Sequence, residues 1–387
     1  MAPDKFAGTL SAVEVAEAVA EGWRRQAPGD DLELVPMADG GPGFVDVLSA
    51  TLGGDLLAVT VTGPHREPVP ATVLLVGETA YLESAQACGL ALTGGDDAAS
   101  ATTYGVGELL LAAVDAGARR VVVGLGGSGT NDGGAGLLAA LGASADRPLD
   151  QGGAALAGVT TITLPTPPDV EIVAASDVDS PLTGLFGATK VFGPQKGLSE
   201  EQLPALDGAL QDLAGAANRR LALAPGAGAA GGLGYGLLLL GAERRPGIGM
   251  VADAIGLAER ARRADLVLTG EGAFDFSSRS GKVPYGVAEI AGAAARPCIV
   301  LAGRVDVGSR EMRALGIESA YSLVDLVGEE QAFGDPAGSL AALAERVART
   351  WSRSASGGRV RSGGITAGVR ELSLRTDPHP PHREPSP

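Results

Sequence analysis

Cysteine and histidine are too scarce in this 387-residue chain to supply several common kinds of site. Cys88 and Cys298 lie far apart without the spacing of metal ligands, and His65 is the only histidine before the last nine residues. This argues against a disulfide framework, histidine metal sites and Ser-His-Asp catalysis. We therefore expect reduced cysteines in a cytoplasmic protein, and a carboxylate wherever a general base is needed.

Basic charge, aromatic residues and long apolar runs are also in short supply. The formal net charge of -16 at pH 7 offers no basic patch for nucleic acid or an anionic membrane, and no apolar run reaches 18 residues. We therefore expect neither nucleic acid nor membrane as a partner. Because aromatic residues make up only 4% of the chain, the cores must be built from Ala, Val and Leu, as where helices pack on parallel strands.

Short β-branched runs alternate with amphipathic helices over most of the chain, which predicts an α/β fold. Three runs separated by turn residues, 57–61, 71–75 and 80–82, break this rhythm and predict a meander. We therefore predict a Rossmann-like parallel-sheet domain built from both chain ends, interrupted by an inserted mixed α/β domain, with two sequential domains as the alternative. The predicted parts are 1–53 with 245–351, the insertion 54–244, and a disordered tail 352–387 rich in Ser, Gly, Arg and Pro.

The strongest local signal is a strand, 121–123, that runs into a glycine-rich turn, 124–134, and then into a helix. Six of the eleven residues in this turn are glycine. Glycine lets the backbone approach an anion closely, and a helix N-terminus offers free N–H groups. The turn predicts a phosphate-binding loop, and a plain tight turn is the simpler interpretation.

Residues 124–129 also match the G-x-G-x-x-G pattern of dinucleotide-binding folds, so an NAD(P)-dependent oxidoreductase is the alternative enzyme class. That pattern needs a second strand ending in an acid about 20 residues further on. Asp146 has the distance, but the residues before it, 141–145, do not read as a strand. No Walker-type G-x-x-x-x-G-K-[ST] segment is present.

Acidic residues repeatedly follow apolar runs, at the ends of strands where α/β proteins bind ligands. Asp39 follows the predicted strand 32–36, and Asp177 with Asp179 follows 170–175. Asp4, Asp132 and Glu271 are placed in the same way. Such carboxylates can bind Mg²⁺ or take a proton from an attacking hydroxyl, although a lone Asp-x-Asp is more often a cap or a turn.

Lysine is rare, and its placement is informative. Only four lysines occur, and Lys5, Lys196 and Lys282 lie beside the loop motifs. A compact ammonium suits phosphate as a point charge, which predicts contacts with a phosphorylated ligand. Chance clustering among four residues is the alternative.

Taken in order along the chain, these motifs resemble the bacterial glycerate kinase family, type I. The resemblance covers residues 1 to about 350. The segments that carry it are 2–6 (APDKF), 38–41 (ADGG), 102–105 (TTYG), 126–134 (GGSGTNDGG), 177–179 (DVD), 192–197 (FGPQKG), 226–234 (GAGAAGGLG) and 269–272 (TGEG).

The resemblance implies a two-domain kinase with an inserted domain, ATP and Mg²⁺ as cofactors, and D-glycerate as the substrate phosphorylated, with 2-phosphoglycerate as product. By position, we predict catalytic roles for Asp177, Asp179, Asp39 and Lys5, and metal binding by Asp177 and Asp179. The predicted cofactor-binding residues are Gly126, Gly127, Ser128, Thr130, Asn131, Asp132, Gly133, Lys196, Glu271 and Lys282. Which hydroxyl is phosphorylated, which carboxylate is the base, and whether the protein is a homodimer stay open.

Three residues depart from the pattern of this family. Ala7, Pro42 and Phe44 stand where it usually has Lys, Glu and Thr, in the two loops nearest the expected acceptor. A catalytically weakened, metabolite-binding relative is therefore a third hypothesis. For a working kinase, the same residues predict near-normal binding of ATP and weak binding of glycerate.

Overall fold

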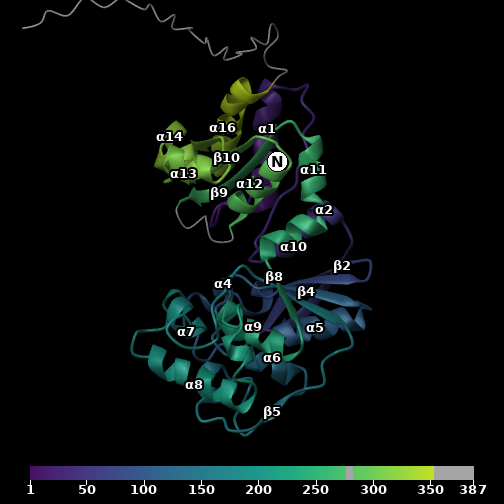
Figure 1. The fold of residues 1–387 in the computed structure, drawn as a ribbon, viewed down its shortest axis with the longest axis vertical. Helices are drawn as coiled ribbons and strands as arrows, with labels where there is room; N and C mark the ends of the chain where they lie inside the picture. The colour runs from purple at the N-terminus through teal and green to yellow at the C-terminus, as the bar shows by residue number, and fades with distance from the viewer. Residues whose placement is uncertain (276–281, 353–387) are drawn as a thin grey trace, which may run out of the picture.

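The computed structural model describes residues 1–275 and 282–352, and its strands form two main sheets (Figure 1). The strand orders are β1-β2-β3-β4-β7-β8 and β11-β10-β9. The strands of the larger sheet are β1 (Asp55–Thr62), β2 (Pro68–Val76), β3 (Thr79–Glu83), β4 (Arg120–Gly124), β7 (Glu171–Ala175) and β8 (Glu243–Arg245). Those of the smaller sheet are β9 (Val267–Phe274), β10 (Cys298–Val305) and β11 (Ser319–Ser322), and β5 (Ser144–Ala145) pairs separately with β6 (Ile162–Thr163).

The larger sheet confirms the predicted meander and joins it to a parallel half. Strands β1, β2 and β3 pair antiparallel, whereas β3, β4, β7 and β8 run parallel. In the parallel half, Glu83 is in register with Gly124, and Gly124 with Ala175. The loops that follow β3, β4 and β7 therefore leave the sheet side by side at one edge.

The smaller sheet is parallel, and two extended segments continue it beyond β9. The amide of Ala2 donates to Leu268 O at 2.7 Å, and the amide of Val35 donates to Met1 O at 2.8 Å. The prediction of a strand at 32–36 is wrong in detail, because this stretch is an extended edge segment bonded through alternate amides. Strand β9 includes Glu271 within its span.

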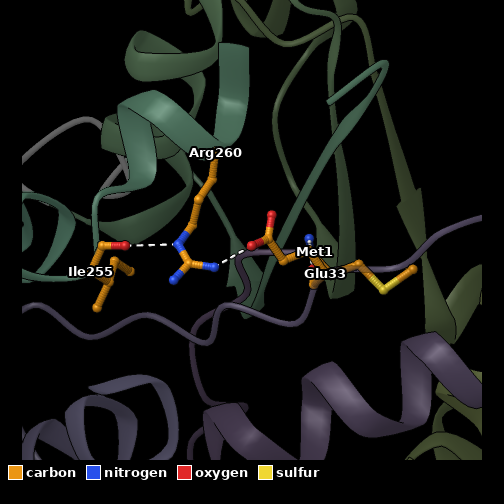
Figure 2. Close-up of polar contacts among 4 residues, drawn as sticks. All are labelled: Met1, Glu33, Ile255 and Arg260. Carbon is orange, nitrogen blue, oxygen red and sulfur yellow. Dashed lines mark hydrogen bonds and ion pairs between the residues drawn. The ribbon is translucent and has the colours of Figure 1, made fainter. Parts of the chain in front are cut away.

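The edge segment is fastened to the helices beside it through one arginine (Figure 2). Arg260 forms an ion pair with the carboxylate of Glu33, and its Nε donates to Ile255 O at 2.8 Å. The carbonyl of Glu33 accepts from the amino group of Met1 at 2.8 Å. Residues 33–37 lead to Asp39. At Glu33 this segment is bonded to Arg260 through its carboxylate and to Met1 through its carbonyl.

Helices cover both faces of both sheets (Figure 1). On the larger sheet, α5 (Tyr104–Asp115), α6 (Ala135–Ala140) and α9 (Ala229–Leu239) cover one face, and α2 (Phe44–Leu52) and α10 (Gly247–Ala254) the other. On the smaller sheet, α11 (Leu257–Arg263), α12 (Val283–Ala293) and α13 (Ser309–Ala314) belong to one core, and α1 (Ala12–Gln26), α14 (Leu323–Val327), α15 (Glu329–Gly334) and α16 (Pro336–Trp351) to another. The remaining elements are α3 (Ala85–Cys88), α4 (Leu90–Thr93), α7 (Ala188–Phe192), α8 (Leu203–Ala216), η1 (Gly153–Leu156), η2 (Pro194–Lys196) and η3 (Leu221–Leu223).

One hydrophobic core runs between the two sheets. Phe44 and Leu48 of α2 and Val251 of α10 are fully or almost fully buried between Tyr81 of the larger sheet and Val300 of the smaller one. Phe44 meets Tyr81 edge to face, with ring centroids 6.2 Å apart. The mixed α/β class with parallel strands is therefore confirmed, and apolar packing connects its two halves.

Within the two described ranges, no helix is both long enough and apolar enough to cross a membrane. The tail expected to be disordered lies, apart from Ser352, outside the described residues.

Candidate active site

Three loops meet above the carboxyl edge of the larger sheet. They are residues 39–43, the glycine-rich turn 124–134, and 176–179, and their backbones touch. A Cβ added at Gly40 would lie 2.8 Å from Ala175 O, and one added at Gly126 would lie 2.5 Å from the Cα of Gly41. Only glycine allows such close backbone contact, which explains why the sequence places glycines here.

Asp177 lies where these loops meet the N-terminus of α10. Its Oδ2 accepts a hydrogen bond from the Ile248 amide at 3.3 Å. Burial raises the pKa of Asp177 to about 6, and the negative charge of Asp39 raises it further, while the hydrogen bonds from α10 and the nearby charge of Arg244 oppose the rise. A carboxylate that titrates near pH 6 is well suited to take a proton from a hydroxyl at neutral pH.

Asp39 and Lys5 come from the two extended segments beside β9. Asp39 Oδ1 accepts from the Gly41 amide at 3.0 Å, which fixes the turn after the edge segment. Lys5 Nζ donates to Pro42 O at 3.0 Å. Lys5 and Asp39 thus both bond to residues 41–42, and the charge of Asp39 acts on Asp177; their catalytic roles stay predictions.

Asp4 is a further acid in this place. Burial raises its pKa to about 7, and the charges of Asp39 and Glu271 add to the rise, while Lys5 opposes it through its charge and through its amide, which donates to Asp4 Oδ1 at 2.8 Å. The site therefore gathers several carboxylates around few cations.

A cavity of about 320 Å³ opens between residues 4–13 and residues 37–47. Its wall includes Asp4, Lys5, Ala7, Pro42 and Asp46. Ala7 and Pro42 thus border the cavity, as the sequence predicted for residues near the acceptor. Phe44 does not, because it is the first residue of α2 and its ring is fully buried in the core.

The glycine-rich turn directs its polar side chains inward. Asp132, fully buried, accepts from the amide and hydroxyl of Thr103, both at 2.8 Å, and from the amides of Gly134 and Gly136. Asn131 Nδ2 donates to Thr189 Oγ1 at 3.0 Å. These side chains hold the turn in shape, so any contact with a ligand falls mainly to its backbone.

Lys196 forms hydrogen bonds with the same turn through its side chain. Its side chain is almost fully buried, and Nζ donates to Ser128 Oγ and to Thr130 O, each at 2.8 Å. Burial lowers the pKa of Lys196 to about 8, against the charges of Cys88 and Asp132. The ammonium is still mostly protonated at pH 7, so it places a positive charge under the turn.

The outer backbone of the turn offers free donors. The amides of Leu125, Gly129 and Gly133 donate to Ala175 O, Cys88 O and Gly231 O. Within the described part of the chain, the amides of Gly126, Gly127 and Ser128 donate to no protein acceptor. Consecutive unpaired amides of this kind form a concave anion site.

Two further predicted residues, Lys282 and Asp179, form ion pairs outside the contacts described so far. Lys282 Nζ lies 3.6 Å from the buried carboxylate of Glu271 and 3.8 Å from Asp275, on the side of β9. The side chain of Asp179 is 81% exposed, and its carboxylate lies 2.7 Å from Arg244 Nη2 of β8.

Metal binding by the predicted magnesium pair, Asp177 with Asp179, stays a prediction. Across residues 1–275 and 282–352, no three His, Cys, Asp or Glu side chains are arranged to hold a metal ion. Mg²⁺ usually binds through one or two carboxylates plus substrate phosphates and water, so a closed protein cage is not required. Asp177, with Asp39 beside it, supplies oxygen ligands of the right kind next to the free amides.

Sequence reasoning missed two charged residues here, Glu83 and Arg244. Glu83 directly follows the predicted strand 80–82, so the rule that selected Asp39 and Asp177 selects it too. Arg244 lies on a strand of three residues that has no recognisable pattern. The structure shows its role through the ion pair with Asp179 and through its charge, which lowers the pKa of Asp177.

Free backbone donors, a carboxylate that titrates near neutrality and an adjoining small cavity define an α/β enzyme that acts on a small phosphorylated or acidic ligand. Comparison with known proteins agrees. The chain matches the model of the glycerate kinase family over residues 1–352 and belongs to that family.

Individual relatives support this assignment. The chain is 41% identical to a glycerate kinase of Bacillus subtilis strain 168, over 84% of this chain and 89% of the relative, and 39% identical to a glycerate 2-kinase of Escherichia coli K12, over 85% and 91%. A crystal structure of a candidate glycerate kinase 2 from Salmonella typhimurium LT2 superposes with a TM-score of 0.76 at 38% identity, covering 90% of this chain and 96% of that one.

Proposed function

We propose that this enzyme transfers the γ-phosphoryl group of ATP to a hydroxyl of D-glycerate in the cytoplasm and releases 2-phosphoglycerate. The glycerate kinases among its relatives support the acid and the donor, and the E. coli relative named as a glycerate 2-kinase supports the product.

The position of Pro42 is the observation that carries the proposal. Pro42 forms part of the cavity wall, and a Cβ added at Gly127 would lie 2.6 Å from its ring. The glycine-rich turn and the cavity therefore both adjoin Pro42. We expect a phosphate bound to the amides to lie close to an acid bound in the cavity.

Each part of the site has a role in this reaction. The amides of Gly126, Gly127 and Ser128 bind ATP phosphates, with the charge of Lys196 beneath them. Lys5, at the cavity wall, attracts the carboxylate of the acid. Asp177 accepts the proton of the attacking hydroxyl.

Mg²⁺ fits the same arrangement. When bound, it neutralises charge on the phosphates of ATP. Asp177 and Asp39 are the carboxylates that would hold it. Catalysis then rests on positioning and electrostatics, without a covalent intermediate.

Purified protein with ATP, Mg²⁺ and D-glycerate tests the proposal. We expect ADP release that depends on the acid, and a phosphorus NMR signal of 2-phosphoglycerate. Release of ADP without acid, or a 3-phosphate product, would contradict the acceptor or the regiochemistry. Binding of glycerate without turnover would favour the metabolite-binding relative.

A further inference from the structure

Glu83 is a buried acid at the active site to which the proposed reaction gives no role. It ends β3 at the carboxyl edge of the larger sheet, in register with Gly124, and only 6% of its surface is exposed. A buried carboxylate is costly unless it is hydrogen bonded, so its partners indicate what it does.

Its partners are the first amides of α2. Glu83 Oε2 accepts from the Gly43 amide at 3.0 Å and from the Val45 amide at 3.5 Å. Gly43 is the N-cap residue of α2 and has no side chain to cap the helix. A carboxylate from the sheet therefore replaces the local cap and complements the positive end of the helix.

The same helix turn forms one wall of the cavity. Pro42, Gly43, Asp46 and Val47 all border it. The carbonyl of Pro42 in turn accepts from Lys5, the cation we assign to the carboxylate of the acid. This wall of the cavity is thus bonded to the larger sheet through Glu83 and to the segment beside the smaller sheet through Lys5.

We propose that Glu83 is a positioning residue for the acid substrate, which sets the distance between the α2 wall and Lys5 without touching the acid itself. This inference rests on the proposed function of the site. It assigns Glu83 to acid binding and not to ATP binding, because its contacts are with residues 43–45 and not with the free amides of the turn.

The surroundings of Glu83 agree with this role. Burial raises its pKa, and the exposed Asp46 adds to the rise, while the two amides and Lys5 oppose it. These are the charged groups that face it. The two amide hydrogen bonds are directed at one oxygen of this carboxylate, as the capping of α2 requires.

Replacement of Glu83 separates positioning from stability when it is paired with a matched control. Glu108 is half-buried, and like Glu83 it accepts a backbone amide, that of Thr62 at 2.6 Å, but it does not border the cavity. The experiment measures kcat, both KM values and the melting temperature for Glu83→Ala, Glu83→Gln, Glu108→Ala and Glu108→Gln.

We expect Glu83→Ala to raise the KM for glycerate on the order of 10-fold with the KM for ATP unchanged, because loss of a charged hydrogen bond has effects of this order. Glu83→Gln, which keeps one acceptor oxygen, should restore part of the loss. The Glu108 variants should lower the melting temperature to a similar extent and leave both KM values unchanged.

Two results would overturn the inference. One is an unchanged glycerate KM in a folded Glu83→Ala variant. The other is a fall in this KM, which would mean that the freed amides bind the acid themselves. Failure of the proposed function is distinct, because the unmodified protein would then not turn glycerate over at all.

Discussion

At the scale of the residue, the two acids that follow β7, Asp177 and Asp179, have different surroundings despite being two positions apart. Asp177 is partly buried against the N-terminus of α10, whereas Asp179 is exposed and paired with Arg244. An exposed ion pair contributes little to stability. The chemistry is therefore expected from Asp177.

We predict that Asp177→Asn lowers kcat at least 100-fold, which corresponds to roughly 3 kcal/mol of transition-state stabilisation. As a base, Asp177 acts only when ionised, so kcat/KM of the unmodified enzyme should rise as the pH increases through about 6 and then level off. A pH profile of kcat/KM measures this. Asp146→Asn, at an exposed carboxylate bonded to Thr160, is the control; an Asp177→Asn variant within a few-fold of the unmodified enzyme would remove Asp177 from the chemistry.

Ala7 gives a second prediction at this scale. Its side chain is exposed at the cavity wall, so Ala7→Lys adds a cation there without displacing the core. A charged hydrogen bond to the acid is worth about 1.5 to 3 kcal/mol, so we expect the glycerate KM to fall about 10-fold or more, with the ATP KM unchanged.

Steady-state kinetics with each substrate varied checks this expectation, and Ala7→Met, which adds length without charge, is the matched control. An equal improvement in both variants would show that packing and not charge limits acid binding. Phe44→Thr offers no parallel gain, since Phe44 is buried in the core away from the cavity.

At the scale of the element, the glycine-rich turn works through backbone shape. Gly127 has φ +68°, and a Cβ there would meet the ring of Pro42 at 2.6 Å. Gly117 has φ +91° with nothing within 4 Å. Alanine at either glycine carries the strain of a positive φ, roughly 1 to 2 kcal/mol, but only Gly127→Ala must also move the turn.

We therefore predict that Gly127→Ala raises the KM for ATP about 10-fold, while Gly117→Ala lowers the melting temperature alone. Nucleotide titrations followed by tryptophan fluorescence or by kinetics distinguish them. If both variants bind ATP like the unmodified enzyme, the free amides of this turn are not the phosphate site.

Sequence patterns predicted the elements well where one face or both faces of a strand are buried. The meander, β4 and β7 were predicted because β-branched and apolar runs there fill the core. Residues 32–36 misled the strand prediction because an edge segment and a strand share the same apolar pattern. The boundaries at 53 and 245 stay predictions.

For the site, sequence patterns located the loops but not the direction of their side chains. Asp132 and Asn131 were predicted to bind cofactor, yet both bond inside the protein. That difference depends on tertiary contacts with Thr103 and Thr189, which no local pattern encodes.

At the scale of the whole molecule, the shared core makes the two sheets depend on one another. Residues of α2 and α10 are buried against both sheets in one hydrophobic cluster. A boundary made of such packing resembles the interior of a domain more than a transient interface.

We predict a single calorimetric transition, with the calorimetric and van't Hoff enthalpies equal. Leu48→Ala in this core and Leu110→Ala beneath the opposite face of the larger sheet should each lower that one melting temperature, at a cost of about 2 to 5 kcal/mol. Two resolved transitions, of which Leu48→Ala shifts one, would show that the sheets unfold independently.

The hydrogen bond from Ala2 to Leu268 O has a consequence during synthesis on the ribosome. After Ala2 emerges, its partner follows roughly 260 residues later, a delay of roughly 13 to 50 s at about 5 to 20 residues per second. All strands of the larger sheet emerge within that delay. The loop assigned to the nucleotide is therefore synthesised before β9, while Asp4 and Lys5 wait for β9 as their partner strand, so the acid-binding side of the site is the last to be completed.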